Sequence, residues 1–130
     1  MFSASTIVRR ILAPVFLFTS LFTGMAQAND DIYRQAWERA ANGAMVVDVR
    51  TPAEFAQGHL PGAINIPLPE VTQQFAARQI PKDADIVLYC RSGNRSGQAQ
   101  RALINLGYSN TFNGLGYDGL MSHQPGNGSK

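Results

Sequence analysis

The chemically most informative stretch of the sequence is a run of seven residues, Cys90 to Ser96, that reads CRSGNRS. It contains the only cysteine of the 130-residue chain, followed by two arginines, a glycine and small polar residues. An apolar segment precedes the run and a helical pattern follows it, so we expect a tight turn between a strand and a helix. Successive backbone N–H groups in such a turn can converge on an anion next to the sulfur.

This setting predicts a reactive thiol. Backbone N–H groups, a helix amino terminus and the guanidinium groups of Arg91 and Arg95 all favour the thiolate and thereby lower the pKa of Cys90. Gly93 supplies the φ freedom that the turn needs, and Ser96 is expected to cap the following helix. The alternative is a small core residue, which is the commonest role of a lone cysteine at the end of a buried strand. The strand–turn–helix context favours the nucleophile.

Strand and helix patterns alternate along the chain and must position this turn. Apolar runs predict strands at residues 44–49, 63–66, 85–89 and 111–112. Helical patterns begin at Asp30 or Asp31, at a Thr51–Glu54 capping box, at Glu70 and after Ser96. Together they indicate an α/β domain with a small, mainly parallel sheet of four to five strands and helices on both faces. Ligands of such sheets bind beyond the carboxyl ends of the strands, where Cys90 is expected to lie.

Other polar residues near the predicted strand ends have structural interpretations. Asp48 and Arg50 close a strand that should end on the same edge as Cys90, and we interpret them as an ion pair or cap. Glu54 already has a capping role. His59 precedes a Pro-Gly turn and is interpreted as a packing or hydrogen-bonding residue. No cluster has metal-ligand spacing, so we expect neither a metal nor another cofactor.

The amino-terminal residues are typical of a secretory signal peptide. Arg9 and Arg10 precede an apolar run at residues 11–22, and Ala26-Gln27-Ala28 supplies a cleavage site after Ala28. The alternative is an uncleaved membrane anchor. Pro14 and the shortness of the run disfavour it, because a spanning helix needs about 20 apolar residues.

The predicted organisation is a leader, one domain and a short end segment. These are a signal peptide at residues 1–28, a single domain at 29–122 and a flexible tail at 123–130. The full chain has a net charge of +2, from 11 basic and 9 acidic residues, but the leader holds two of the basic ones. The neutral mature chain gives no support for a nucleic-acid partner. We expect a periplasmic or secreted monomer that has no membrane association after cleavage.

The CRSGNRS run and an upstream segment, VVDVRTPAEFAQGHLPGAINIP at residues 46–67, together resemble the rhodanese domain of sulfurtransferases. The resemblance covers about residues 45–119, and the two motifs occur in the family's order. With the leader, the chain is similar to the small periplasmic single-domain rhodaneses. It departs from the family's Gly-Gly and aromatic-rich helix at residues 114–119, and it begins with a helix where many relatives have an additional strand.

The resemblance implies thiosulfate sulfurtransferase chemistry. Cys90 would attack the outer sulfur of thiosulfate, expel sulfite and hold the transferred atom as a persulfide. A thiol or cyanide would then accept it in a ping-pong reaction. Arg91 and Arg95 are candidates to hold the sulfonate. The substrate-binding loop would comprise Arg91, Ser92, Gly93, Asn94, Arg95 and Ser96.

Three other classes of protein compete with this interpretation. Cysteine phosphatases place five residues between cysteine and arginine, whereas four separate Cys90 from Arg95, and a loop this short should crowd a phosphate. A thioredoxin-like oxidoreductase needs a second cysteine. A non-catalytic sulfur carrier or binding module would use the same loop, so the sequence leaves that alternative open.

Overall fold

The computed structural model describes residues 27–126. Most of the predicted leader and the last four residues of the predicted tail lie outside this range, so the predictions for those segments stay untested. The chain divides into two compact units, residues 1–31 and 32–130. Of the first unit, residues 27–31 are described, and they are helical. The second unit contains the elements discussed below.

The second unit alternates strands and helices in the predicted order. Its strands are β1 (Met45–Asp48), β2 (Ile64–Asn65), β3 (Ile86–Cys90) and β4 (Thr111–Gly116). Its labelled helices are α2 (Pro52–Ala56), the 3-10 helix η1 (Leu68–Glu70), α3 (Val71–Ala77), α4 (Asn94–Asn105) and α5 (Tyr117–Ser122). Residues 32–41 are also helical and precede β1. Among residues 27–126, no helix combines the length and the apolar character that crossing a bilayer requires.

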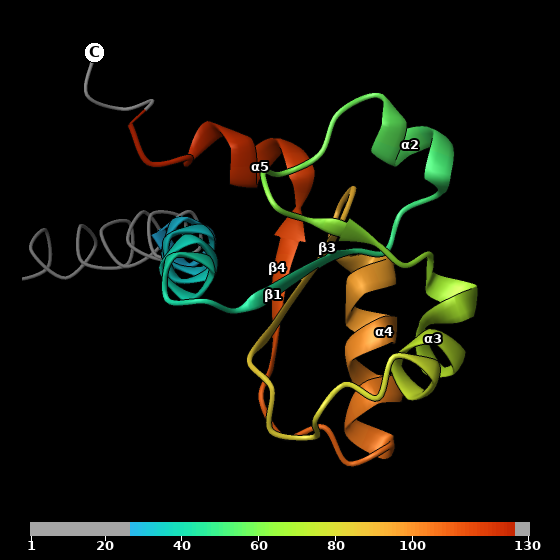
Figure 1. Cartoon of the computed structure of the whole chain (residues 1–130). Coiled ribbons are helices and arrows are strands. Elements are labelled where there is room, and N and C mark those ends of the chain that lie inside the picture. Colours follow the sequence, from blue (N-terminus) through green and yellow to red (C-terminus); the bar gives the residue numbers. More distant parts are fainter. Residues whose placement is uncertain (1–26, 127–130) are drawn as a thin grey trace, which may run out of the picture. The chain divides into compact units, whose positions relative to one another are not determined.

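The four strands form one parallel sheet in the order β2-β1-β3-β4 (Figure 1). The register pairs Asp48 with Tyr89, and Cys90 with Gly116 across an irregularity between Leu88 and Cys90. Because all strands run in one direction, their carboxyl ends meet at a single edge, with α2 and α5 beyond it (Figure 1). The predicted α/β fold with a small parallel sheet is therefore confirmed.

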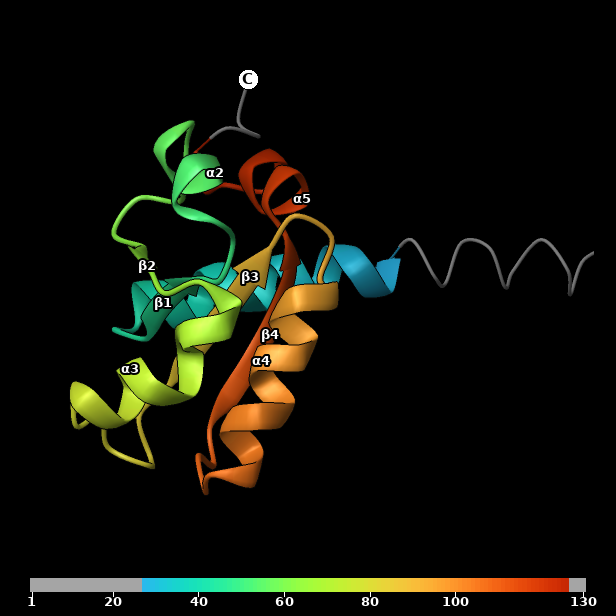
Figure 2. The same cartoon turned by 90° about the vertical axis from the view of Figure 1, so that its right-hand side faces the viewer.

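Side chains of successive strand residues enter two hydrophobic layers, one on each face of the sheet. Val47, Leu88 and Cys90 belong to the layer that also contains Phe75 of α3 and Leu103 of α4. The other layer combines strand residues with the helix of residues 32–41 and with α5, and its buried members are Ala36, Val46, Leu60, Val87, Tyr89 and Leu120. Figures 1 and 2 show α3 and α4 together on one face. Helices on both faces explain why the central strands are apolar throughout.

Several predicted boundaries are wrong, and the reasons are local. Residues 27–30 are already helical, so Asp30 and Asp31 do not cap the first helix; Gln27 and Ala28 are themselves compatible with a helix. The helical pattern at residues 70–79 corresponds to the shorter α3, and the 3-10 helix η1 precedes it. The capping box of α2 is confirmed, since the Thr51 hydroxyl accepts the Glu54 N–H at 3.2 Å and the Glu54 carboxylate accepts the Thr51 N–H at 3.1 Å.

The start of α4 also differs from the prediction. Gly93, with φ of +100°, occupies the N-cap position, and the helix begins at Asn94. Ser96 therefore lies inside the first turn and is fully buried rather than capping the helix. Its hydroxyl is turned towards the carboxyl edge of the sheet, where it contacts Cys90 and Asn113.

Candidate active site

Cys90 is the last residue of β3, and the turn that follows directs polar groups at its sulfur. The residue is 1% exposed, as expected for the end of a strand that is buried along its whole length. Its Sγ accepts a hydrogen bond from the Gly93 N–H at 3.0 Å, and the Ser96 Oγ lies 3.5 Å away. Gly93 itself has a left-handed conformation, with φ of +100°, from which the chain enters α4, and glycine adopts this conformation without steric strain.

The surroundings of the sulfur lower its pKa. Burial is the largest single influence and raises the pKa of the Cys90 thiol, because it disfavours the charged form. Hydrogen bonds from the Ser96 hydroxyl and from the backbone N–H groups of Ser96, Gly93 and Ser92 act in the opposite direction and together outweigh it. The net pKa of Cys90 lies below its ordinary value, so the thiolate is favoured.

Asn113 of β4 holds this turn in place. Its Oδ1 accepts the Ser96 hydroxyl at 2.7 Å and the Leu115 N–H at 3.0 Å. Its Nδ2 donates to the Gly93 carbonyl oxygen at 3.1 Å. One amide side chain thus connects the helix start, the glycine turn and the neighbouring strand. The sequence analysis missed Asn113, because no local pattern relates it to a turn some twenty positions earlier.

Gly116 allows β4 to pass close to the same turn. A Cβ atom at this position would collide with the carbonyl oxygen of Arg91, a backbone atom that cannot rotate away. The preceding residue, Leu115, has φ of +69°, and its side chain packs against Gly93. The backbone of β4 therefore covers one side of the Cys90 turn.

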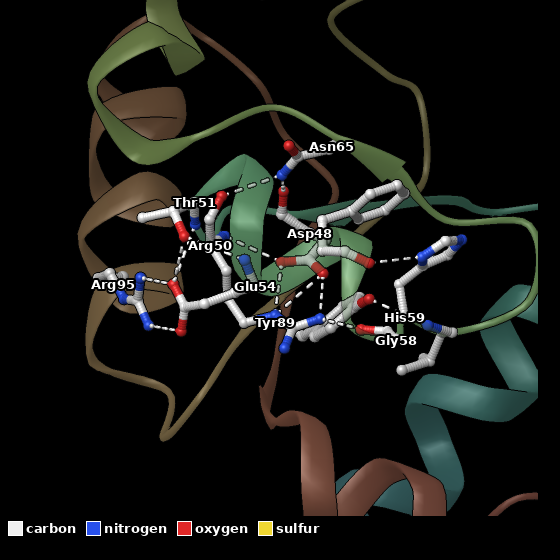
Figure 3. Close-up of polar contacts among 11 residues, drawn as sticks. Asp48, Arg50, Thr51, Glu54, Gly58, His59, Asn65, Tyr89 and Arg95 are labelled. Carbon is white, nitrogen blue, oxygen red and sulfur yellow. Dashed lines mark hydrogen bonds and ion pairs between the residues drawn. The ribbon is translucent and has the colours of Figure 1, made fainter.

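The Arg95 side chain pairs with Glu54 of α2 (Figure 3). Its Nη1 and Nη2 donate to the two carboxylate oxygens at 2.8 and 3.0 Å. The hydrogen bonds from Arg95 and from Thr51 lower the pKa of Glu54 to about 2. Glu54 thus caps α2 and also links it to α4. The Arg95 guanidinium, which was predicted as a candidate to hold the sulfonate of the substrate, therefore already binds the Glu54 carboxylate.

Asp48 and Arg50 form a buried ion pair at the end of β1 (Figure 3). Arg50 Nη2 lies 2.6 Å from Asp48 Oδ2 and also donates to the Gly58 carbonyl oxygen at 2.7 Å. The hydrogen bond with Asp48 is the main reason that the pKa of Arg50 is raised. The interpretation of these two residues as a structural ion pair is confirmed.

His59 has the packing role that its sequence context predicted. Its ring stacks on Phe55, with the ring centroids 3.7 Å apart and an angle of 5° between the planes. Its Nδ1 lies 2.9 Å from the Phe55 carbonyl oxygen (Figure 3). These contacts fix the turn after α2. Within residues 27–126, no group of three or more His, Cys, Asp or Glu residues is arranged to hold a metal ion.

A pocket of about 200 Å³ opens beside the turn. Its walls come from the end of β1, from α2 and the residues after it, from the first residue of the turn and from α5. The lining residues are Arg50, Glu54, Gln57, Gly58, Arg91, Tyr117 and Asp118. Arg91 follows Cys90 directly and is exposed. A small charged molecule in this pocket would lie next to the turn that holds the sulfur.

Comparisons with known proteins agree with this architecture. The model of the rhodanese-like domain matches residues 33–118. A sulfurtransferase of Allochromatium vinosum is 46% identical over 69 residues, which cover 53% of this chain and 63% of that protein. The thiosulfate sulfurtransferase PspE of Escherichia coli is 41% identical over 70 residues, which cover 54% of this chain and 67% of that protein. The matches thus span about two thirds of these relatives' length.

Solved structures give the same result. A rhodanese with anions from E. coli superposes with a TM-score of 0.56 at 38% identity, over 59% of this chain and 91% of that chain. The human single-domain sulfurtransferase TSTD1 gives a TM-score of 0.55 at 28% identity, over 64% of this chain and 85% of that chain. The family model matches well over half of the chain, and it includes both the Cys90 turn and the strands that position it. The chain belongs to the family of rhodanese-like domains.

Proposed function

We propose that the protein is a sulfurtransferase that moves the outer sulfur of thiosulfate to a thiol or cyanide acceptor through a persulfide on Cys90. The observation that carries this proposal is the environment of the Cys90 sulfur, where the Gly93 N–H donates at 3.0 Å and the pKa is lowered despite burial. A sulfur whose thiol pKa is lowered although it is buried is suited to nucleophilic attack.

The reaction has two balanced steps. The Cys90 thiolate attacks the outer sulfur of thiosulfate, the sulfur–sulfur bond of thiosulfate breaks, and its electron pair leaves with sulfite. The new persulfide anion occupies the space beyond Sγ. There the backbone N–H groups of the turn from Arg91 to Ser96, which includes Ser92 and Asn94, stabilise its charge. The acceptor then attacks the outer sulfur and restores the thiolate.

Arg91 and Arg95 take different parts in this proposal. Arg91 is exposed, lines the pocket and is offered to the sulfonate of thiosulfate. Arg95 is held by Glu54, so it contributes positive charge and fixes the loop rather than gripping the substrate. The hydrogen bond with Glu54 is the main reason that the pKa of Arg95 is raised, and the negative charge of Cys90 raises it further.

The names of relatives support thiosulfate as the sulfur donor and a thiol as the acceptor. Thiosulfate sulfurtransferases of E. coli and Pseudomonas aeruginosa are 41% and 38% identical over the matched residues. A thiosulfate:glutathione sulfurtransferase of Saccharomyces cerevisiae is 37% identical, which supports a thiol as acceptor. Cyanide is the convenient acceptor for an assay.

Intact mass spectrometry tests the proposal. Thiosulfate should add one sulfur atom to the purified protein, and cyanide should remove it. Cys90→Ser should abolish both the mass gain and turnover while the circular dichroism spectrum stays unchanged. Turnover in a folded Cys90→Ser variant would overturn the mechanism, because the chain has no other thiol. A persulfide that forms only from a protein donor, without thiosulfate turnover, would instead identify a sulfur carrier.

A further inference from the structure

The pocket beside Arg91 has a size and a charge pattern that the first half of the reaction does not require. Its volume of about 200 Å³ is below the roughly 300–1,000 Å³ of sites for drug-sized ligands. It is bounded by α2 on one side and by the first residues of α5 on the other. Its occupant must therefore be a compact molecule.

Two of the charged side chains in its wall are already neutralised. Arg50 forms the buried pair with Asp48 at 2.6 Å. Glu54 forms the two-pronged pair with Arg95, at 2.8 and 3.0 Å. Arg50 and Glu54 could therefore bind a charged ligand only by giving up their present ion pairs.

Unlike Arg50 and Glu54, the other two charged residues of the pocket wall, Arg91 and Asp118, are not neutralised by a neighbour among the described residues. Within residues 27–126, neither side chain has a hydrogen-bond or ion-pair partner, and both line the pocket. Arg91 comes from the Cys90 turn and Asp118 from the first turn of α5. The pocket therefore presents one uncompensated cation and one uncompensated anion. A dianion such as thiosulfate uses the first and is repelled by the second, so Asp118 has no favourable role towards the sulfur donor.

We propose that this pocket is the binding site for the sulfur acceptor and that the acceptor is a compact thiol carrying both a carboxylate and an ammonium group, such as cysteine. This inference rests on the proposed function. The Arg91 guanidinium would bind the carboxylate, and the Asp118 carboxylate would bind the ammonium group. Arg91 serves both half-reactions in turn, because sulfite leaves before the acceptor enters.

The chemistry of the second step is balanced without any oxidant. The acceptor thiolate attacks the outer sulfur of the Cys90 persulfide, and the sulfur–sulfur bond of the persulfide breaks. The electron pair returns to the Cys90 thiolate, which the turn already stabilises. The product is the persulfide of the amino-acid thiol.

Three small thiols allow the proposed Arg91–carboxylate and Asp118–ammonium contacts to be tested one at a time. L-cysteine carries both charged groups, 3-mercaptopropionate carries only the carboxylate, and cysteamine carries only the ammonium group. The protein is loaded with sulfur, freed of thiosulfate by desalting and mixed with each thiol, and the second-order rate constant for loss of the persulfide is measured. The thiols differ in intrinsic reactivity, so the readout is the change in a ratio of rate constants between wild type and variant.

Asp118→Asn should reduce the preference for cysteine over 3-mercaptopropionate about tenfold, the loss of one charge-assisted hydrogen bond. Arg91→Gln should reduce the preference for cysteine over cysteamine by a similar factor of about ten. Asp83→Asn is the matched control, because Asp83 is exposed in the loop before β3, at the opposite end of that strand. It should leave both ratios unchanged.

The outcomes distinguish this inference from the proposed function. If the loaded wild type carries no cyanide-labile sulfur on Cys90, the sulfurtransferase mechanism itself fails. If the persulfide forms but Asp118→Asn leaves the cysteine preference unchanged or raises it, the acceptor site alone is overturned. Rate constants that rise together for cysteine and 3-mercaptopropionate in Asp118→Asn, with their ratio unchanged, would mean that Asp118 pairs with Arg91 in solution and competes with the carboxylate of the ligand.

Discussion

The Ser96 hydroxyl has one hydrogen and two acceptors. Asn113 Oδ1 lies 2.7 Å from the Ser96 Oγ, whereas Cys90 Sγ lies 3.5 Å away. The shorter contact matches an ordinary O–H···O hydrogen bond, and the longer one is at the limit for sulfur. The hydroxyl therefore donates mainly to Asn113. The backbone N–H groups of the turn, with Gly93 at 3.0 Å, carry most of the stabilisation of the thiolate.

Ser96→Ala should consequently slow the reaction of Cys90 only modestly. Loss of a weak hydrogen bond at the sulfur reduces the thiolate fraction, so alkylation by iodoacetamide at neutral pH should slow by about three- to tenfold. The pH profile of alkylation should move to higher pH, since the variant loses one of the groups that lower the pKa of Cys90. Ser109→Ala, in the loop before β4, is the control and should leave the profile unchanged. A hundredfold slowing would mean that the hydroxyl, rather than the backbone, holds the thiolate.

Local patterns indicated the proposed nucleophile and predicted the turn after it, but they did not predict the partners that hold the turn. The spacing of Cys90, Gly93 and the helical pattern is contained within a few residues, so the sequence alone could indicate it. Arg95 and Glu54 are 41 positions apart. Their pairing depends on where the fold places α2. Ser96 was misassigned as a cap because a glycine in the left-handed conformation can occupy that position as well.

At the scale of elements, the Glu54–Arg95 pair connects α2 to the start of α4. Both side chains are partly exposed, at 22% and 31%, so solvent weakens their attraction. The same carboxylate closes the capping box of α2. Its removal should therefore loosen α2 at one wall of the pocket as well as destabilise the fold.

Glu54→Gln should lower the free energy of unfolding by about 1–2 kcal/mol at neutral pH, from the lost ion pair and cap. The folded-state pKa of Glu54, about 2, lies below the unfolded value of about 4.3. The carboxylate thus contributes its full stabilisation above about pH 5 and loses it as the pH falls towards 2. Urea unfolding of both proteins from pH 7 to pH 2.5 should show the difference shrinking. A difference that is undiminished at pH 2.5, or one equal to that of the control Glu38→Gln, would contradict this role.

Because β4 passes close to the Cys90 turn at Gly116, a larger residue at this position should disturb the turn. In Gly116→Ala the new Cβ meets the Arg91 backbone, so either the turn or the strand must move. We expect the unfolding free energy to fall by about 1–3 kcal/mol, as for overpacked cores. Thiosulfate turnover should also fall in the protein that remains folded, because the turn that holds Cys90 is displaced. Gly114→Ala is the matched control. Its Cβ would lie 3.3 Å from a Val87 methyl group, so it should cost less and leave turnover nearly intact.

The sequence predicted the order of strands and helices correctly, but it predicted their first and last residues less well. β1 and β3 were predicted almost completely, because strands buried on both faces appear as continuous apolar runs. β4 was predicted at two residues, yet it spans Thr111–Gly116. Asn113, Gly114 and Gly116 have low strand propensity, so pairing with β3 determines this strand rather than local preference.

At the scale of the molecule, the sheet is packed on both faces and the site lies at one edge. β1 and β3 both contribute consecutive residues to the two hydrophobic layers, and β3, which is buried along its whole length, ends at Cys90. The proposed nucleophile is therefore held by a strand that is buried along its whole length, while α2 and α5, which line the pocket, pack at the edge (Figure 1). The proposed two-step reaction needs this arrangement, because donor and acceptor must reach the same buried sulfur from one edge of the sheet.

The final prediction concerns the mature protein, whose boundary the core composition helps to define. Within residues 27–126, the buried and partly buried members of the two hydrophobic layers begin at Tyr33, and the family model also begins at residue 33. Of the described residues, cleavage after Ala28 would therefore remove none that belongs to either layer. The chain produced with its leader should be exported and should begin at Asn29 by amino-terminal sequencing. Ala26→Asp, which disrupts the small-residue site, should accumulate as precursor. An exported wild-type protein that retains Met1 would show that the leader is not cleaved.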